Sequence, residues 1–304
     1  SEDLGNGYSV GFLLENGFTM DNGAAGEDGK AFSKQATLSL SGNFGELAFG
    51  RMGGLASYEG SYSIWDASPL GTDYLQGGLG NTFVTGQINN NSIVYVSPEF
   101  GGLKIHAQYS NGVEEDTQKW SRNSHYYGLG ATYEIGNLSL AGIVERFDNK
   151  GAENKDKDKA TIVYSLSAAY DFEVAKAFFG YQYASRFHGF DQLEDVTVAG
   201  KGMNQNAFTL GAEVPAAGGT FKVAANYGFG KVKSADGVVV GDEKLSNDKF
   251  NRFTVGAAYE YPLSKRTFVY GWGAYATAGK MLKEKAVEED FKSWSLGLGL
   301  HHAF

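Results

Sequence analysis

The side chains best suited to acid–base chemistry are five histidines scattered along the chain: His106, His125, His188, His301 and His302. A serine nucleophile needs a histidine base within hydrogen-bond reach and a third group that orients that base. No serine is placed at a matching depth on a strand beside His106. We therefore predict no catalytic residues and a protein that is not an enzyme. A membrane-bound lipase-like or protease-like barrel stays open as the enzymatic alternative.

Ligand chemistry is equally sparse. The chain has no Cys, so it forms no disulfide or thiolate site, and no phosphate loop, zinc spacing or nucleotide fingerprint occurs. Acidic residues in segment 147–159 are loosely spaced, which favours a solvated connection over a weak cation site. We predict no cofactor and no metal. The net charge of −9 argues against a nucleic-acid partner.

Charged side chains instead fall at every second position of apolar runs. Lys104 lies between Leu103 and Ile105, and the same parity holds for a set of further charged residues: Lys176, Glu213, Lys222, Arg252 and Glu260. Successive side chains of a β-strand point to opposite faces. We expect these charges, among them Lys104, Lys176 and Lys222, to line a wet inner face.

Period-2 alternation runs from one end of the chain to the other. Examples are the segments 8–15, 103–109, 221–229 and 294–301, each with one apolar face and one small or polar face. Such alternation is typical of half-buried strands, and no helical period competes over a comparable length. We count about fourteen strands.

The connections alternate between short and long. Six are short, around 43–45, 98–102, 134–137, 171–173, 215–219 and 262–265, and long polar ones lie between them. This pattern is typical of an antiparallel up-and-down meander with two unlike ends, as in outer-membrane barrels. A soluble β-sandwich is the alternative, but it would more often contain Greek-key crossovers.

Composition agrees with a membrane barrel. Aromatic residues make up 14% of the chain and Gly accounts for 43 residues. No stretch approaches the ~20 apolar residues of a spanning helix, but a barrel strand needs only ~9–11 alternating residues. Aromatic residues near strand ends are expected to form interfacial girdles: Tyr133, Tyr170, Tyr183, Tyr259, Tyr261, Phe291 and Trp294.

Several segments together resemble the general, non-specific trimeric porins of Gram-negative bacteria, most of all the neisserial and β-proteobacterial type. They are SLSGNFGELAFGR (Ser39–Arg51), NSIVYVSPEFGGL (Asn91–Leu103), YPLSKRT (Tyr261–Thr267) and GLHHAF (Gly299–Phe304). No single motif is decisive, but their order and spacing cover essentially the whole chain.

The resemblance implies an all-β, transmembrane antiparallel barrel of sixteen strands that forms one outer-membrane domain over residues 1–304. It implies a homotrimer in contact with lipid and lipopolysaccharide. Ser1–Gly7 resembles the family's turn after its second strand, so we expect one to two further N-terminal strands in the functional protein. Phe304 matches a C-terminal aromatic signal for the barrel-assembly machinery.

In the resembled family the third loop folds into the barrel and narrows the pore, which here is segment 53–88. Carried over by position, the constriction is expected to contain Glu15, Gln35, Arg51, Glu59, Asp66 and Asp73. Strict alternation with Leu47 and Phe49 places Arg51 on the lipid side, and we expect the strand end to turn it inward.

The expected function is passive diffusion of small hydrophilic solutes and ions through a water-filled channel. Because two basic positions of the family are absent here, at Gln35 and around Gln87–Asn91, we predict a weak preference for cations. A substrate-specific channel is the alternative. Its sign would be a row of inward aromatic rings, for which Phe178, Tyr126 and Tyr275 are the candidates.

Overall fold

The computed structural model describes residues 1–19, 22–24, 30–57, 60–71, 82–84, 88–112, 123–148, 159–190, 193–198, 201–233, 239–240, 243–245, 248–284 and 292–303. In these ranges the chain is almost entirely β-strand, with a single 3-10 turn, η4 (Met281–Lys283). None of the helical structure in these ranges has the length and hydropathy to span a membrane.

Fifteen strands form one antiparallel sheet in which each strand pairs with its neighbours in chain order. They are β1 (Glu2–Gly5), β2 (Tyr8–Glu15), β3 (Gln35–Gly42), β4 (Gly45–Gly53), β5 (Ile88–Val96), β6 (Leu103–Asn111), β7 (His125–Ile135), β8 (Leu138–Asp148), β9 (Thr161–Asp171), β10 (Lys176–Phe187), β13 (Met203–Ala216), β14 (Gly219–Val232), β17 (Lys249–Ser264), β18 (Thr267–Lys280) and β19 (Lys292–His302). The predicted meander is confirmed. The count exceeds our fourteen because Glu2–Gly5 already pairs with β2.

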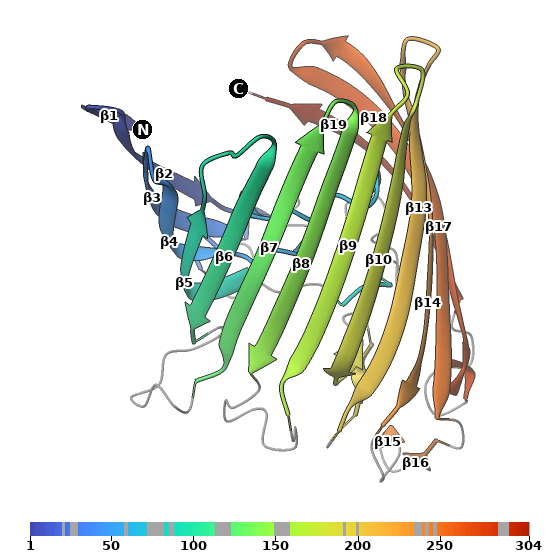
Figure 1. Cartoon of the computed structure of the whole chain (residues 1–304). Coiled ribbons are helices and arrows are strands. Elements are labelled where there is room, and N and C mark those ends of the chain that lie inside the picture. Colours follow the sequence, from blue (N-terminus) through green and yellow to red (C-terminus); the bar gives the residue numbers. More distant parts are fainter. Residues whose placement is uncertain are drawn as a thin grey trace.

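The sheet curls into a barrel wall (Figure 1). Strands β6–β10 face the viewer, and β18 and β19 pass behind them. The terminal strands β1 and β19 are not paired with each other within the described ranges. A soluble sandwich is excluded, because the long strands belong to one sequentially ordered sheet rather than to two facing sheets.

The two ends of the wall differ as predicted. Short turns join β3 to β4, β7 to β8, β13 to β14 and β17 to β18 at one end, and the long connections lie at the other (Figure 1). The β7–β8 turn has only two residues, and its Gly136 has a φ of 58°, which a residue without a Cβ adopts at little cost. Two small hairpins lie in the long connections, β11 (Gly189–Phe190) with β12 (Leu193–Thr197) and β15 (Val239–Val240) with β16 (Glu243–Lys244).

The outer face of the wall is apolar and exposed. On β19 the alternate side chains Leu296, Leu298 and Leu300 are 74%, 91% and 62% exposed. On β7, Leu129 lies between the outward rings of Tyr127 and Tyr133. Leucines at mid-strand with aromatic rings toward both ends form the apolar band and flanking girdles of a membrane barrel.

Of the aromatic residues predicted for the girdles, Tyr133, Tyr170, Tyr261 and Trp294 are large exposed side chains. Phe291 lies outside the described residues. Exposure of many large apolar side chains is unfavourable for a soluble protein in water, but it is favourable where the side chains contact lipid. The period-2 signal is therefore inverted relative to a soluble sheet, with the apolar side outward.

Candidate functional site

The connection between β4 and β5 lies against the inner face of the wall. Its described parts are residues 54–57, 60–71 and 82–84. Side-chain amides on several strands of the wall form hydrogen bonds with the backbone of this connection. The Ser61 N–H donates to Gln35 Oε1 of β3 at 2.9 Å, the Val84 N–H donates to Gln182 Oε1 of β10 at 2.7 Å, and Gln205 Nε2 of β13 donates to the Thr82 carbonyl at 2.7 Å.

Inward glycines leave room for the same connection. A Cβ built on Gly130 of β7 would lie 2.6 Å from Ile64 Cδ1, and one on Gly180 of β10 would lie 2.5 Å from the Ala67 Cβ. On β13, a Cβ at Gly211 would lie 2.5 Å from Pro69 Cδ. Cβ contacts below 3.0 Å do not occur without a shift of the neighbouring atoms, so these glycines let the connection approach the wall closely.

The connection also reaches the far strands of the sheet. Leu70 is 2% exposed and packs with Ala224 of β14 and Ala258 of β17, against which Trp272 of β18 also packs. The contacts of the described parts of this segment thus run from β3 to β17. Such a path requires it to cross the space that the curved wall surrounds.

Two of the predicted constriction residues contact each other. Gln35 Nε2 donates to Glu15 Oε2 at 2.5 Å, linking β3 to β2. Because the Gln35 carbonyl oxygen also accepts the Ser61 N–H, this pair joins the wall to the connection. The sequence placed both residues on the inward parity, and their cross-strand register brings them face to face.

Asp66 of the connection lies opposite Lys176 of β10, with 3.8 Å between Oδ2 and Nζ. Both side chains keep substantial exposure, 60% for Asp66 and 35% for Lys176. The Lys176 ammonium also lies 4.8 Å from the ring centroid of Phe178. A carboxylate and an ammonium that both stay wet create a field across the space between them.

Arg51 keeps the outward parity of β4. Its register partner on β3 is Ala36, on the same face as Leu47 and Phe49. Its Nε donates to the Ser33 carbonyl at 2.7 Å, and one of its terminal nitrogens donates to Asn90 Oδ1 at 2.5 Å. The structure therefore places its guanidinium at the strand end, with no ion pair to a carboxylate recorded among the described residues.

Three predicted residues, Glu59, Asp73 and Phe304, lie outside the described residues.

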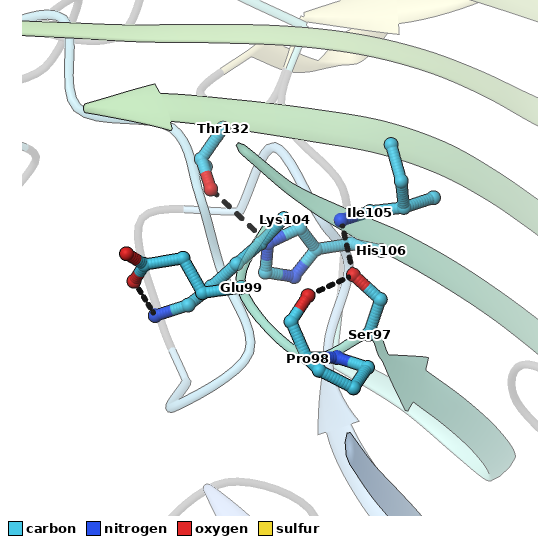
Figure 2. A network of polar contacts seen from close by, with 7 residues as sticks. All are labelled: Ser97, Pro98, Glu99, Lys104, Ile105, His106 and Thr132. Carbon is cyan, nitrogen blue, oxygen red and sulfur yellow. Dashed lines mark hydrogen bonds and ion pairs between the residues drawn. The ribbon is translucent and has the colours of Figure 1, made fainter. Parts of the chain in front are cut away.

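The wall cations are described. Lys104 of β6 pairs with Glu99 at 3.5 Å at the short-turn end (Figure 2). Beside it, His106 Nε2 lies 3.4 Å from Thr132 Oγ1, and the Ser97 hydroxyl accepts the Ile105 N–H (Figure 2).

Lys222 of β14 lies between two carboxylates, Glu260 at 2.8 Å and Glu213 at 3.5 Å. These three residues come from adjacent strands at the same level of the wall. The arrangement carries one net negative charge. The inward parity predicted for Lys222, Glu213 and Glu260 agrees with this cluster.

Several inward polar side chains that contact the connection were not singled out from the sequence. Besides Gln182 and Gln205 they include Glu46, whose Oε1 accepts the Tyr62 hydroxyl at 2.6 Å. Burial, followed by this hydrogen bond, raises the pKa of Tyr62 above its usual range. The available signal was inward parity combined with a long polar side chain, but parity does not reveal which residues meet the connection.

Of the three candidates for inward aromatic rings, Phe178 and Tyr126 are buried on the inner face, and Tyr275 is not. Tyr275 was a candidate, yet it is 41% exposed and pairs with Trp294 on the outer face, so that assignment was wrong. Its position differs by one residue from the inward Ala274 and Ala276, and one step reverses the face. Tyr270 and Trp272 of β18 have the inward parity instead, opposite Glu260 and Ala258.

Within the described residues, no group of three or more acidic or histidine side chains has a metal-binding arrangement. All five histidines have partners. His106 contacts Thr132, and His302 Nδ1 lies 2.9 Å from Thr267 Oγ1. His125 Nδ1 lies 3.2 Å from the Tyr109 hydroxyl, and His188 Nδ1 lies 2.6 Å from the Val198 carbonyl oxygen. The ring of His301 stacks on Phe268 at a centroid distance of 4.7 Å. None of these contacts is the serine, base and orienting group that nucleophilic catalysis requires.

Known proteins with similar sequences agree with this geometry. A family described as Gram-negative porin matches residues 1–280. An outer membrane porin protein of Bordetella pertussis is 30% identical over 100% of this chain and 80% of its own length. A major outer membrane protein P.IB of Neisseria meningitidis is 29% identical over 100% of this chain and 80% of its own.

Solved structures agree in fold. An anion-selective porin from Comamonas acidovorans superposes with a TM-score of 0.62 at 25% identity, covering 100% of this chain and 87% of that one. OmpF of Salmonella typhi superposes with a TM-score of 0.64 at 15% identity, covering 99% of this chain and 87% of its own, which shows likeness of fold alone.

Proposed function

The chain belongs to the Gram-negative porin family, and we propose from this premise how it conducts. It is an outer-membrane porin, a β-barrel through which small hydrophilic solutes and ions diffuse passively. One observation carries the detailed proposal: the described parts of the connection, residues 54–57, 60–71 and 82–84, contact inward side chains on strands from β3 to β17. A segment along such a path narrows the lumen. In this reading residues 1–304 are a single barrel domain, and segment 53–88 is its constricting loop.

The constriction is proposed to contain Glu15, Gln35, Arg51, Glu59, Asp66 and Asp73, with Lys104, Lys176 and Lys222 along the wall. The strongest support is the ion pair of Asp66 and Lys176. In this pair a loop carboxylate faces a wall ammonium, and both side chains remain exposed. Opposite charges on two sides of a narrow aqueous passage orient water and select solutes by charge and dipole. Arg51 has the least support, because its register is outward.

A weak preference for cations is proposed. The described inner wall pairs Lys222 with two carboxylates, and it adds the carboxylates of Glu15 and Glu46, which accept hydrogen bonds from Gln35 and Tyr62. The name of the Comamonas relative states anion selectivity for that protein. The basic residues that would favour anions are absent here at Gln35 and around Gln87–Asn91.

The assembled protein is proposed to be a homotrimer in contact with outer-membrane lipid and lipopolysaccharide. Phe304 is proposed as the C-terminal signal for the barrel-assembly machinery. Family membership supports the trimer, and the exposed apolar outer face supports the contact with lipid. No enzymatic role is proposed, since the family and the relatives are channels.

A substrate-specific channel is the second candidate. A relative from Halomonas, 26% identical over 87% of this chain, is named a monosaccharide porin. Tyr270 and Trp272 on the inner face of β18 are the aromatic rings on which a sugar ring would pack. Saturable, sugar-dependent block of ion current would favour this candidate over a general pore.

Planar-bilayer recording of the full-length refolded protein tests the proposal. We expect ohmic channels that close in three equal steps and a reversal potential in a KCl gradient of the sign for cation preference. Folded protein that never conducts would overturn the channel, and single-step closure would overturn the trimer. A reversal potential of the opposite sign would overturn only the cation preference.

A further inference from the structure

The first turn of the loop is held by two side chains of the wall. The Tyr126 hydroxyl of β7 accepts the Leu55 N–H at 2.8 Å and donates to Glu145 Oε1 of β8 at 2.7 Å. The same carboxylate oxygen accepts the Ala56 N–H at 3.1 Å. Two consecutive backbone donors of the loop thus end on one hydroxyl–carboxyl pair.

The pair is completely enclosed. Tyr126, Glu145, Leu55 and Ala56 are each 0% exposed, and Glu145 Oε2 has no hydrogen-bond partner among the described residues. A buried polar group is costly unless it is satisfied. These atoms are shielded from water. The Leu55 and Ala56 N–H groups therefore depend on the Tyr126–Glu145 pair for their hydrogen bonds.

Packing confirms that the wall is shaped for this turn. A Cβ on Gly128 of β7 would lie 3.1 Å from Leu55 Cδ1, and one on Gly54 would lie 3.1 Å from both Glu145 Oε1 and the Tyr126 hydroxyl. Leu55 therefore sits over a wall position without a side chain, while Gly54 passes over the polar pair at close range. The ladder between β7 and β8 is complete without the two side chains, since backbone pairing continues through both residues.

We propose that Tyr126 and Glu145 are positioning residues that anchor the start of the constricting loop and thereby set the width of the passage. This inference rests on the proposed role of the loop as the constriction. The pair touches no solute. It acts by fixing the turn at residues 54–56, from which the chain continues to Asp66 and the opposite wall.

The first test removes the hydroxyl. Tyr126→Phe keeps the ring in place but leaves the Leu55 N–H without its acceptor. We expect channels of altered mean conductance with larger open-state current fluctuations. Tyr127→Phe is the matched control, because Tyr127 is the next residue of β7 and points outward with 38% exposure. It should conduct like the wild type.

Loop position is measured separately with a thiol. The chain has no Cys, and Ser57 is 3% exposed, so Ser57→Cys places a single near-isosteric thiol beside the anchored turn. Its reaction with a charged methanethiosulfonate should be slow alone and with Tyr127→Phe. With Tyr126→Phe we expect the rate to rise roughly tenfold or more, the factor that loss of a buried hydrogen bond produces in an opening equilibrium.

Glu145 supplies the second pair of variants. Glu145→Gln keeps an oxygen that accepts both hydrogen bonds, so its current should stay close to that of the wild type. Glu145→Leu should behave like Tyr126→Phe. If wild type conducts and all these variants match it in current and in thiol rate, the anchor is refuted while the porin function stands. If wild type itself forms no channel, the proposed function fails first.

Discussion

At the residue scale, the inner wall carries charge in opposed pairs rather than as one sign. Asp66 faces Lys176 across 3.8 Å, and Lys222 lies between Glu213 and Glu260. An exposed pair such as Asp66 and Lys176 contributes little to stability. In a wet channel their effect is instead on the ions that pass, which makes single-charge variants informative about selectivity.

Reversing the charge of Asp66 should shift selectivity toward anions. A unit charge about 6 Å from a permeating ion contributes roughly 0.7 kcal/mol in water before salt screening. We therefore expect Asp66→Lys to lower the cation-to-anion permeability ratio by about three- to tenfold, as measured from reversal potentials. Glu173→Lys makes the same charge change in the short β9–β10 connection and should leave the ratio unchanged. Equal effects of both variants would contradict a role for Asp66 in the passage.

Removing the Lys222 ammonium should have the opposite sign. Lys222→Met leaves Glu213 and Glu260 facing the lumen without their cation, so cation preference should increase. Lys231→Met is the control from the same strand, because Lys231 pairs with Asp248 at 2.9 Å where both side chains are more than half exposed. A reversal potential that moves equally for both variants would show a general surface-charge effect instead.

At the element scale, the loop depends on glycines of the strands it crosses. A loop that packs on the wall at van der Waals distance requires positions without a Cβ, and Gly130, Gly180 and Gly211 supply them on three strands. At Gly211 the atom nearest to an added Cβ belongs to Pro69 of the loop, so a methyl group there tests chiefly the loop contact.

Gly211→Ala should displace the loop. The new Cβ would lie 2.5 Å from Pro69 Cδ, which forces the loop away from β13 and into the passage, and we expect a lower single-channel conductance. Gly142→Ala is the matched control, since its Cβ would lie an ordinary 3.4 Å from Leu166 on the outer face. Unchanged conductance in Gly211→Ala would argue against close packing of the loop at this strand.

At the scale of the whole molecule, the outer face behaves as a surface made for lipid. Leu166 in the middle of β9 is 55% exposed, and Leu263 near the β17–β18 turn is 58% exposed. Equal exposure in a soluble protein would mean equal tolerance of a charge. In a bilayer the cost depends on depth instead.

Lysine substitutions at these two leucines should therefore differ. Leu166→Lys is expected to reduce the free energy of unfolding by about 2–4 kcal/mol, and Leu263→Lys by about 0–1 kcal/mol. Reversible urea unfolding in lipid vesicles measures both. Similar losses for the two variants would mean that Leu166 does not lie near the bilayer centre.

Much of the architecture was determined by local sequence alone. Period 2 fixes which side chains share a face, because alternation is a property of the extended backbone. It correctly assigned the outward leucines of β19 and the inward Lys176, Glu213 and Lys222. Short and long connections likewise predicted the meander and its two unlike ends, since a tight antiparallel turn has a recognisable composition.

Only the tertiary structure decided what the loop touches. Gln182 and Tyr126 lie far from residues 54–84 in the sequence, and their hydrogen bonds to Val84 and Leu55 depend on how the wall curves. Alternation likewise gave no reason to select Glu145 from other inward acids. Tyr275 was misassigned because a one-residue error in phase reverses a strand's faces. Local pattern sets the face of each residue, whereas contacts across the lumen follow from the closure of many strands around one space.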